Sequence, residues 1–282
     1  MFSKKHAWMK LLGVLFFFGL ILTGCSNQKT SADKDNKPLV VATSGTLYPT
    51  SFHDPKSQKL TGYDVEVVKA VAKKLHRKVE FKEYNVDGQL TAVKTGKADI
   101  AANDFSISPA RMKEFALSTP YKHSFSSMVV RKSDNSGINS WSDLKGKKAA
   151  GEAGTNYQLL AKKLGATPVN YDNVSNDVYL KDVKSGKTDV ILNDYYLQKL
   201  ALAAVPNSGL KLLSNMYYMT PENKAGAGML MKKGNTKLQK EVNKALAELK
   251  KDGTLAKISK KFYHADVTKK PKAKISRTFT SD

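Results

Sequence analysis

Cysteine is almost absent from the chain, because Cys25 is the only one among 282 residues. A lone cysteine excludes an intrachain disulfide and a zinc site built from several cysteines. Acidic residues are also scarce, with 25 Asp and Glu against 47 Lys and Arg, so the formal net charge is +22. Apolar residues still make up 41 % of the chain. This balance is typical of a globular protein and excludes both a disordered chain and a membrane-spanning bundle.

Long hydrophobic runs are confined to the N-terminus. Three lysines precede an uncharged run at 11–22, which is too short to span a bilayer but suits the core of an export signal. The run ends in LTGC at 22–25, which resembles the lipobox of bacterial lipoproteins. We therefore expect a lipoprotein signal peptide at 1–24, a lipid on Cys25 and a flexible tether at 25–38. The mature protein would be lipid-anchored on the extracytoplasmic face of the cell membrane; a buried free cysteine is the alternative.

The basic residues are not gathered in one block. They recur singly or in pairs on the polar faces of helical segments, without the aromatic motifs or finger spacing of nucleic-acid binders. We expect no nucleic-acid partner, and a basic surface that faces anionic lipids or cell-wall polymers. The segment 269–282 carries five basic residues and few apolar ones, which predicts a basic mobile tail.

Short apolar runs alternate with helical periods along the rest of the chain. Apolar residues recur at helical spacing at 67–75 and 238–249, and the second helix should end at Gly253. This alternation favours α/β layers with a mostly parallel sheet. Buried strands are predicted at 39–43, 79–84, 98–102, 128–131, 148–150, 169–171 and 189–192.

One segment of the sequence is repeated ninety residues later. LTAVKTGKADIAAND at 90–104 matches LKDVKSGKTDVILND at 180–194 at eight of fifteen positions. Each copy reads as a helix end, a glycine stop and a buried strand that closes on Asn-Asp. Because ligands of open α/β sheets gather at the carboxyl ends of strands, two similar lobes should each present an Asn-Asp pair. Two generic helix-to-strand connections are the alternative.

Motifs for catalysis and metal binding are missing. SGKT at 185–188 resembles the end of a phosphate loop, but the glycine required earlier is replaced by Lys181. The sequence has no Gly-x-Ser-x-Gly elbow, and its five histidines are scattered, with no pair at metal-ligand spacing. We therefore expect no enzyme activity, no cofactor and no metal. A binding protein is favoured.

A series of short motifs follows the chain in a characteristic order and spacing. They are LTGYDVEV at 60–67, ISPAR at 107–111 followed by Phe115, Ser118, Pro120 and Tyr121, WSDLKGK at 141–147, Gly154–Thr155, Asn193–Asp194 and ALAELKKDGTL at 245–255. In these motifs the chain resembles the family-3 solute-binding proteins of bacterial amino-acid ABC importers. The resemblance covers nearly all of the mature chain.

The resemblance implies a bilobed type-II periplasmic-binding-protein fold, an α/β structure with two mixed sheets flanked by helices. Lobe 1 would comprise 39–127 and 225–268, and lobe 2 would comprise 132–221. A two-strand hinge would lie at 128–131 and 222–224. An amino acid would bind between the lobes and stabilise a closed form. The implied partners are an ABC permease and its ATPase, with the binding protein itself a monomer.

Three residues would recognise the charged groups that all amino acids share. Arg111 follows a Ser-Pro helix start, and its guanidinium can bind an α-carboxylate with two parallel hydrogen bonds. A surface ion pair with Glu114 is the alternative. Thr155 should begin a helix of lobe 2 and meet the same carboxylate with its hydroxyl and nearby N–H groups. Asp194 would accept the α-ammonium, or else only cap a helix.

Selection of the ligand side chain is expected mainly from lobe 1. Tyr48 matches the family's stacking aromatic, with ordinary packing as the alternative. Asn103 and Asp104 stand at a strand tip, and Ser106 would add a hydroxyl contact. Asp104 would repel a second carboxylate and could accept an additional ammonium, which disfavours glutamate. L-Cystine is the first candidate, because the GYDVEV and MVVR motifs are most similar to those of cystine receptors.

Two other functions remain open from the sequence. The basic exterior could make the protein a surface adhesin for anionic matrix or wall polymers. Such adhesion should weaken steeply with salt, whereas zwitterion binding in a closed cleft should not. Some relatives of this fold are dehydratases, so an enzyme is the third possibility.

Overall fold

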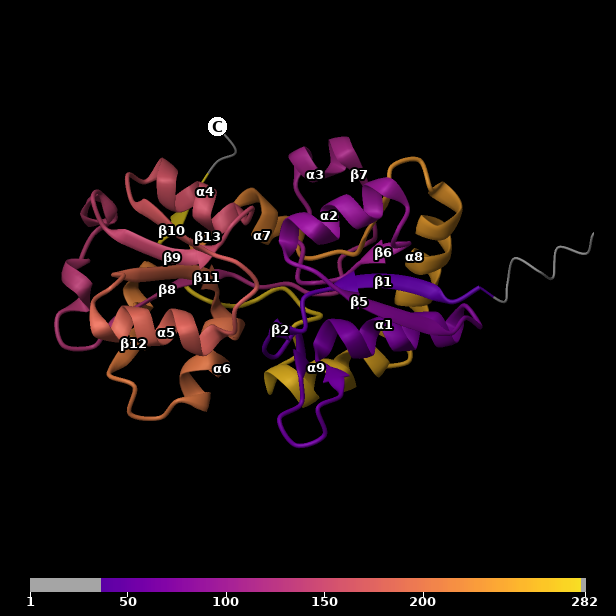
Figure 1. The fold of residues 1–282 in the computed structure, drawn as a ribbon, viewed down its shortest axis with the longest axis horizontal. Coiled ribbons are helices and arrows are strands. Elements are labelled where there is room, and N and C mark those ends of the chain that lie inside the picture. The colour runs from indigo at the N-terminus through magenta and orange to yellow at the C-terminus, as the bar shows by residue number, and fades with distance from the viewer. Residues whose placement is uncertain (1–36, 280–282) are drawn as a thin grey trace, which may run out of the picture.

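The computed structural model describes residues 37–279, and these form two lobes side by side (Figure 1). The predicted signal peptide, Cys25 and most of the predicted tether lie outside the described residues, as do the last three residues of the chain. Within 37–279, no helix combines the length and the apolar content that a membrane crossing requires. The predicted bilobed α/β fold is confirmed.

Lobe 1 is built around a five-stranded sheet in the order β5-β1-β6-β14-β7. β1 runs parallel to β5 and β6, and β14 runs antiparallel to β6 and β7, so the sheet is mixed. Its elements in the described chain are β1 (Leu39–Thr43), β2 (Thr46–Leu47), β3 (Ser51–His53), β4 (Leu60–Thr61), α1 (Tyr63–Lys74), β5 (Val79–Glu83), α2 (Val86–Thr95), β6 (Ile100–Ala101), α3 (Pro109–Glu114), β7 (Phe115–Leu117), β14 (Leu230–Lys232), α8 (Thr236–Lys251) and α9 (Thr254–Tyr263).

Side chains of β1 point alternately to the two faces of the lobe 1 sheet, and each face has its own part of the core. Leu39 and Val41 pack with apolar residues of α1, α8 and α9, whereas Ala42 packs with residues of α2. Successive side chains of a strand point to opposite faces, so a run of apolar residues serves both layers. Helices therefore cover the sheet on both sides, and its strand ends are left facing lobe 2.

Lobe 2 has a larger mixed sheet in the order β10-β9-β11-β8-β13-β15, with β12 also paired to β8. α4 packs on one face of this sheet, and α5 and α6 pack on the other. Its elements in the described chain are β8 (Ser126–Arg131), the 3₁₀ turns Asn135–Gly137, Trp141–Leu144 and Ser214–Met216, β9 (Lys148–Glu152), α4 (Asn156–Lys163), β10 (Thr167–Tyr171), α5 (Asn176–Ser185), β11 (Val190–Asp194), α6 (Tyr195–Ala204), β12 (Leu210–Leu212), β13 (Tyr218–Met219), α7 (Pro221–Ala225) and β15 (Arg277–Thr278).

The predicted regular elements are present. All seven predicted strands overlap observed ones, namely β1, β5, β6, β8, β9, β10 and β11. The prediction that they are buried was wrong for β5 and β10, because both are edge strands without a buried residue. The two predicted helices are α1 and α8, and Gly253 after α8 is left-handed with φ 80°. In the repeat, Gly96 and Gly186 end α2 and α5 in the left-handed conformation. The repeated sequence therefore forms the same local structure in both lobes.

The two segments predicted as hinge strands both belong to lobe 2. Residues 128–131 lie inside β8, in the middle of the lobe 2 sheet. The prediction of a strand at 222–224 was wrong, because Pro221–Ala225 is the short helix α7. The Thr220 hydroxyl accepts the N–H of Asn223, and proline suits the first helical turn. The chain crosses between the lobes directly before β8 and after α7, near an isolated bridge of Lys122 with Ala227.

The C-terminal segment makes a further crossing to lobe 2 (Figure 1). β15 pairs in parallel with β13, and the Phe279 ring lies 5.0 Å from the Trp141 ring, centroid to centroid. The Arg277 guanidinium lies 5.5 Å from the same Trp141 ring. Composition predicted a mobile tail, whereas its described part adds an edge strand to lobe 2. The reason is that its single aromatic side chain packs against aromatic partners.

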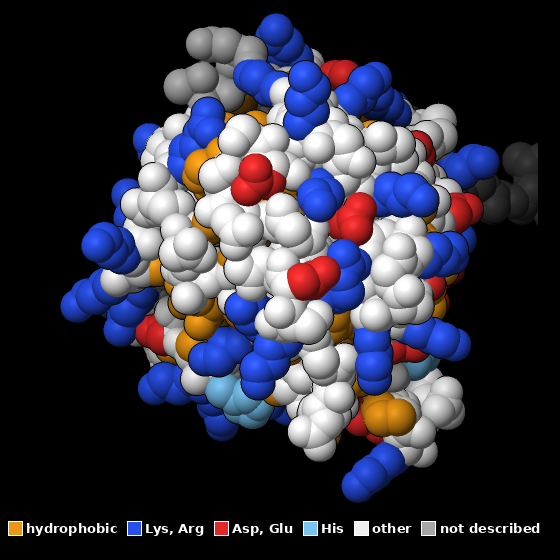
Figure 2. All heavy atoms as spheres, turned by 90° about the vertical axis from the view of Figure 1, so that its left-hand side faces the viewer, with side chains coloured by type: hydrophobic (Ala, Val, Ile, Leu, Met, Phe, Trp, Pro, Cys, Tyr) orange, Lys and Arg blue, Asp and Glu red, His pale blue; other side chains and the backbone are white. Residues whose placement is uncertain are grey.

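Figure 2 shows the outer end of lobe 2. Lys and Arg side chains are spread over this face among neutral ones, with few acidic side chains between them. The excess of positive charge is thus distributed over the surface, without one continuous basic block on this face. This agrees with the spacing of lysines along the sequence.

Candidate functional site

A cavity of about 80 Å³ lies between the lobes. Five of the seven predicted ligand-binding residues line it, and they come from both lobes: Asn103, Asp104, Ser106, Arg111 and Thr155. The connections after β6 bring the first four together, and the start of α4 brings the fifth. The lining of one cavity therefore carries a guanidinium, a carboxylate and the first turn of a helix.

Two predicted residues lie outside the lining of this cavity. The Tyr48 ring packs edge-on to Phe52 at 4.9 Å, and its carbonyl accepts a hydrogen bond from Asn176 of lobe 2. Its neighbour Leu47 lines the cavity in its place. Asp194 lies beside a much smaller adjoining cavity of about 10 Å³, which Asp104 also lines.

Arg111 is held against the cavity wall by its own loop. The predicted Ser-Pro start of α3 is present, and Arg111 lies in its first turn. The Nη1 atom donates to the Ser106 carbonyl at 2.9 Å, and the guanidinium lies 5.2 Å from the Phe105 ring centroid. The alternative partner, Glu114, forms an ion pair with Lys94. These contacts fix the position of a group that can bind a carboxylate with two parallel hydrogen bonds.

Thr155 begins α4, as predicted. Its hydroxyl oxygen accepts the N–H of Gln158 at 3.4 Å, and its proton is donated to the Glu152 carbonyl at 2.9 Å. A hydroxyl has only one proton to donate. A ligand carboxylate at this end of the cavity would therefore meet the N–H groups of the first helical turn, which have no partner within the helix.

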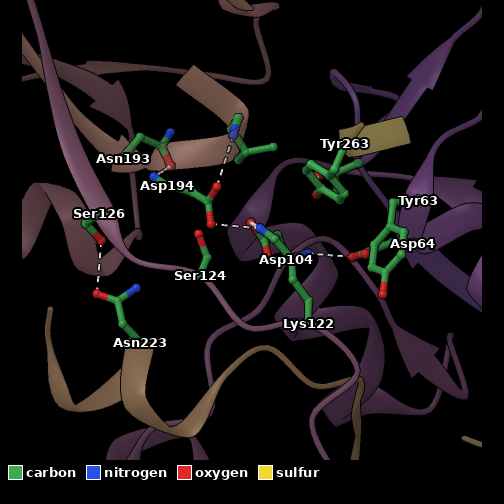
Figure 3. A network of polar contacts seen from close by, with 12 residues as sticks. Tyr63, Asp64, Asp104, Lys122, Ser124, Ser126, Asn193, Asp194, Asn223 and Tyr263 are labelled. Atoms are coloured by element: carbon green, nitrogen blue, oxygen red, sulfur yellow. Dashed lines mark hydrogen bonds and ion pairs between the residues drawn. The ribbon is translucent and has the colours of Figure 1, made fainter. Parts of the chain in front are cut away.

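A buried lysine connects the two lobes (Figure 3). The Nζ of Lys122 lies 2.6 Å from the Oδ2 of Asp104 and 2.8 Å from the Oδ2 of Asp194, and the lysine side chain is only 1 % exposed. Asp104 follows β6 of lobe 1, and Asp194 ends β11 of lobe 2. The two aspartates that end the sequence repeat thus bind the same ammonium group. Sequence reasoning missed Lys122.

Burial and charge oppose one another in this cluster. Burial raises the pKa of Asp104 to about 7; the Lys122 ammonium acts against this rise, and Asp194 and Asp64 add to it. Burial also works against the charge of Lys122, but the carboxylates of Asp104 and Asp194 outweigh it and hold the lysine pKa well above its usual value. Lys122 therefore stays positively charged, and the Asp104 carboxyl holds its proton more strongly than an exposed aspartate does.

A third carboxylate fixes the backbone of Asp104. Asp64, fully buried at the start of α1, accepts the Asp104 N–H on its Oδ2 at 2.6 Å. Burial raises the pKa of Asp64 to about 6. The φ of Asp104 is 57°, a left-handed conformation that Asp and Asn tolerate better than most residues. The carboxylate is therefore displayed from a defined turn and not from a regular strand.

Hydrogen bonds between the lobes run along the rim of the cavity. Glu152, which sequence reasoning also missed, lines the cavity and accepts the Val86 N–H at 3.3 Å. Burial raises the pKa of Glu152, with Asp172 and Asp87 adding to it. The other bonds join Thr46 to Asn173 at 2.9 Å, Asn85 to Asp172 at 2.6 Å and Asn176 to the Tyr48 carbonyl at 2.9 Å. The lobes are thus in direct contact around the site.

Known proteins resemble this chain over most of its length. The probable ABC transporter extracellular-binding protein YckB of Bacillus subtilis is 52 % identical over 279 residues, which cover 95 % of this chain and 96 % of YckB. An ancestral arginine-binding protein bound to arginine is 33 % identical, with a TM-score of 0.72, over 80 % of this chain and 98 % of that one.

A second solved structure superposes less well on this chain. The L-cystine solute receptor of Neisseria gonorrhoeae, in the unliganded open conformation, is 36 % identical over 85 % of this chain and 99 % of that one. Its TM-score is only 0.57.

The model of the bacterial extracellular solute-binding proteins, family 3, matches residues 39–265. These residues include every strand of both sheets except β15, and also Arg111, Lys122 and the two aspartates that bind it. The chain belongs to this family and is an amino-acid-binding protein of an ABC transporter.

Proposed function

We propose that this protein captures a polar L-amino acid between its lobes, outside the cytoplasmic membrane, and delivers it to an ABC permease driven by an ATPase. L-Cystine is the first candidate. The observation that carries the proposal is the lining of the interlobe cavity, where Arg111 and Asp104 stand together with the first turn of α4. A cation and an anion in one cavity suit a zwitterion.

Closure of the lobes strengthens this recognition. The ligand carboxylate binds Arg111 and the N–H groups that begin α4, and its ammonium binds the acidic side of the cavity. When the lobes meet, water leaves the site, and each ion pair gains because the local dielectric falls. Loss of one partner then leaves a buried charge uncompensated, which costs several kcal/mol.

The acidic groups of the cavity support a ligand with more than one ammonium or with a guanidinium. Asp104 and Glu152 both line it, and Asp194 adjoins it. Cystine carries two ammonium groups, and the gonococcal cystine receptor is a relative at 36 % identity. Arginine is the competing ligand, because the same acidic groups accept a guanidinium. Glutamate is disfavoured, since Asp104 repels a second carboxylate.

The membrane anchor is part of the proposal. The LTGC motif at 22–25 supports lipidation of Cys25 after cleavage, and two or three acyl chains would hold the protein durably on the membrane. Mass spectrometry of the protein extracted from membranes tests this, because a diacylglyceryl group on Cys25 is expected. A Cys25→Ser variant that stays in the membrane fraction would contradict the anchor.

A thermal-shift screen tests the ligand. The full-length chain, purified in detergent, is heated with each common amino acid and with L-cystine. A ligand at 100 times its Kd stabilises the folded form by about 2.7 kcal/mol, so one or a few polar amino acids should raise Tm by several degrees. Arg111→Ala should remove the shift for every amino acid. No shift with any of them on the unmodified chain would contradict the proposal.

A further inference from the structure

The C-terminal strap, residues 266–279, is fixed to lobe 1 at its start. Val267 is fully buried in the lobe 1 core with residues of α1, α8 and α9. Its N–H donates to the Ser259 hydroxyl at 2.8 Å, and its carbonyl accepts the N–H of His123 at 2.7 Å. His123 directly follows Lys122, which forms the isolated bridge with Ala227 where the chain crosses between the lobes. The strap therefore begins beside this crossing.

The other end of the strap is part of the lobe 2 sheet, where β15 pairs in parallel with β13. The N–H of Ser276 donates to the Tyr217 carbonyl at 2.8 Å, and the N–H of Phe279 donates to the Met219 carbonyl at 2.8 Å. The Phe279 ring packs against the lobe 2 core, with the Trp141 ring 5.0 Å away. Backbone hydrogen bonds and apolar packing thus hold the strap at both ends.

Between these ends, residues 269–275 form no helix or strand and pass from one lobe to the other (Figure 1). Exposed and half-buried side chains alternate here: Lys272 and Lys274 are exposed, whereas Ala273 and Ile275 are half-buried. A period of two is typical of an extended chain with one side against a surface. The middle of the strap therefore lies against the protein and is not looped into solvent.

The strap lies beyond the part of the chain that the family model matches. That match ends at residue 265, and the strap begins at the next residue. Within 37–279 the chain also crosses between the lobes before β8 and after α7, so the strap is a third connection. A device built from the strap would therefore be an addition to the fold that the family model describes.

We propose that the C-terminal strap restricts separation of the lobes and thereby strengthens amino-acid binding. The proposal rests on amino-acid binding between the lobes and goes beyond it by assigning a device that sets the affinity. Both ends of the strap are bonded in this structure, while Thr46 contacts Asn173 and Asn85 contacts Asp172 across the lobes. The strap is thus compatible with lobes in contact, and it excludes only arrangements in which they lie farther apart.

Such a restraint acts through the open form of the protein. An unrestrained open form has many arrangements, and each one that the strap excludes lowers the share of the open form in the population. The closed form becomes more populated, and the apparent affinity for a ligand of that form rises in proportion. The size of the effect depends on the length of 269–275, because doubling a flexible connection lowers the probability that its ends stay close about threefold.

Lengthening the strap tests the proposal without removing its ends. Seven Gly and Ser residues inserted between Lys272 and Ala273 would double the length of 269–275 and leave β15 in place. Titration calorimetry with the full-length chain in detergent would use L-cystine, or L-arginine if cystine gives no thermal shift. The lengthened strap should weaken binding about threefold. Trp141 emission should stay unchanged, because Phe279 still packs against it.

Hydrogen exchange at the rim of the cavity measures separation of the lobes directly. The N–H of Val86 begins α2, where it has no partner within its helix, and it donates to Glu152 of lobe 2 at 3.3 Å. Exchange of this N–H without ligand therefore follows opening of the lobes. The lengthened strap should speed this exchange about threefold, and saturating ligand should remove the difference.

A matched insertion separates the role of the strap from the effect of an insertion as such. The same residues placed between Asn207 and Ser208 lengthen an exposed turn between α6 and β12, both of lobe 2. Affinity and Val86 exchange should then equal those of the unmodified chain. A chain that ends at Thr268 should change both at least as much as the lengthened strap does. If the shortened chain does not fold, the lengthened strap decides.

The outcomes also separate this proposal from the proposed function. Unchanged exchange of Val86 in the lengthened strap, or unchanged or tighter binding, would overturn the restraint while amino-acid binding stands. If the unmodified chain binds neither amino acid, the proposed function fails, and exchange of Val86 still tests the strap by itself. Thermal unfolding checks that each variant folds.

Discussion

The two copies of the sequence repeat fold alike in their first part, but the aspartate that ends each copy has a different structural setting in the two lobes. In both lobes a helix ends at a left-handed glycine, Gly96 with φ 76° and Gly186 with φ 78°, and a buried strand comes next. In lobe 2 the strand runs on into α6, and Asp194 caps that helix. In lobe 1 the strand ends earlier, and Asp104 lies in a turn with φ 57°.

The difference shows that the residues after each Asn-Asp pair decide what its aspartate does. After Asn193–Asp194 comes Tyr-Tyr-Leu-Gln, which continues as a helix and uses the carboxylate as its N-cap. After Asn103–Asp104 comes Phe-Ser-Ile-Ser-Pro, which delays the next helix to residue 109. The carboxylate of lobe 2 thus caps a helix, and that of lobe 1 does not.

The largest expected effect contrasts one arginine from each lobe. Arg111 lines the cavity, whereas Arg131 of lobe 2 lies outside its lining and pairs with Asp189 at 3.3 Å. Arg111→Ala should weaken amino-acid binding by about 100-fold or more, because it removes the charged partner of the carboxylate in a closed site. Arg131→Ala should leave affinity unchanged in the same calorimetric titration. Equal affinities for both variants would remove Arg111 from the site.

The next effect tests the dependence of lobe 2 on the C-terminal segment. Phe279→Ala should lower the free energy of unfolding by about 2 kcal/mol, since the ring is half-buried against Trp141 and Tyr218. Trp141 emission should shift to longer wavelength as water reaches it. Denaturant unfolding followed by fluorescence measures both. The exposed Thr278→Ala is the control, and matching results for the two variants would contradict packing of the tail.

A smaller effect tests the part of the repeat that the lobes share. Gly96→Ala and Gly186→Ala should each lower the free energy of unfolding by about 1 kcal/mol, because both force a side chain into the left-handed region. The space around the two glycines is open, so strain is the only expected cost. Denaturant midpoints of the two variants should agree. Clearly different midpoints would contradict the view that the two glycines have the same role in both lobes.

The smallest effect concerns the acid that lobe 2 contributes to the cavity. Burial raises the pKa of Glu152 above its usual value, so the folded protein binds a proton there more tightly than the unfolded chain does. Stability contributed by this group is therefore lost as pH rises from about 4.5 through the folded pKa. Glu152→Gln should flatten that decline in thermal unfolding between pH 5 and 7. An unchanged pH profile would show that Glu152 is not buried in solution.

Local signals in the sequence predicted most of the fold. Apolar runs marked the strands, the glycines marked helix ends, and Ser108 and Thr155 marked helix starts that the structure confirms. Each of these signals acts over a few neighbouring residues, so a single sequence suffices to recognise it. The family resemblance, read together with these signals, predicted seven site residues, and five of them line one cavity.

Contacts distant in sequence could not be predicted in the same way. Lys122 stands in a segment without periodicity, and its burial depends on Asp104 and Asp194, which are 18 and 72 residues away. The place of the C-terminal segment depends on the Trp141 ring, which composition does not reveal. One signal for the lysine was available: both Asp104 and Asp194 were predicted to line the closed site, and two buried carboxylates close together require a cation.

A crystal structure of the full-length protein with its bound amino acid tests the central claim most directly. The account predicts the ligand between the lobes, with its carboxylate on Arg111 and the N–H groups that begin α4, and its ammonium on the acidic side of the cavity. A ligand found outside the interlobe cavity, or a ligand carboxylate without contact to Arg111, would contradict it.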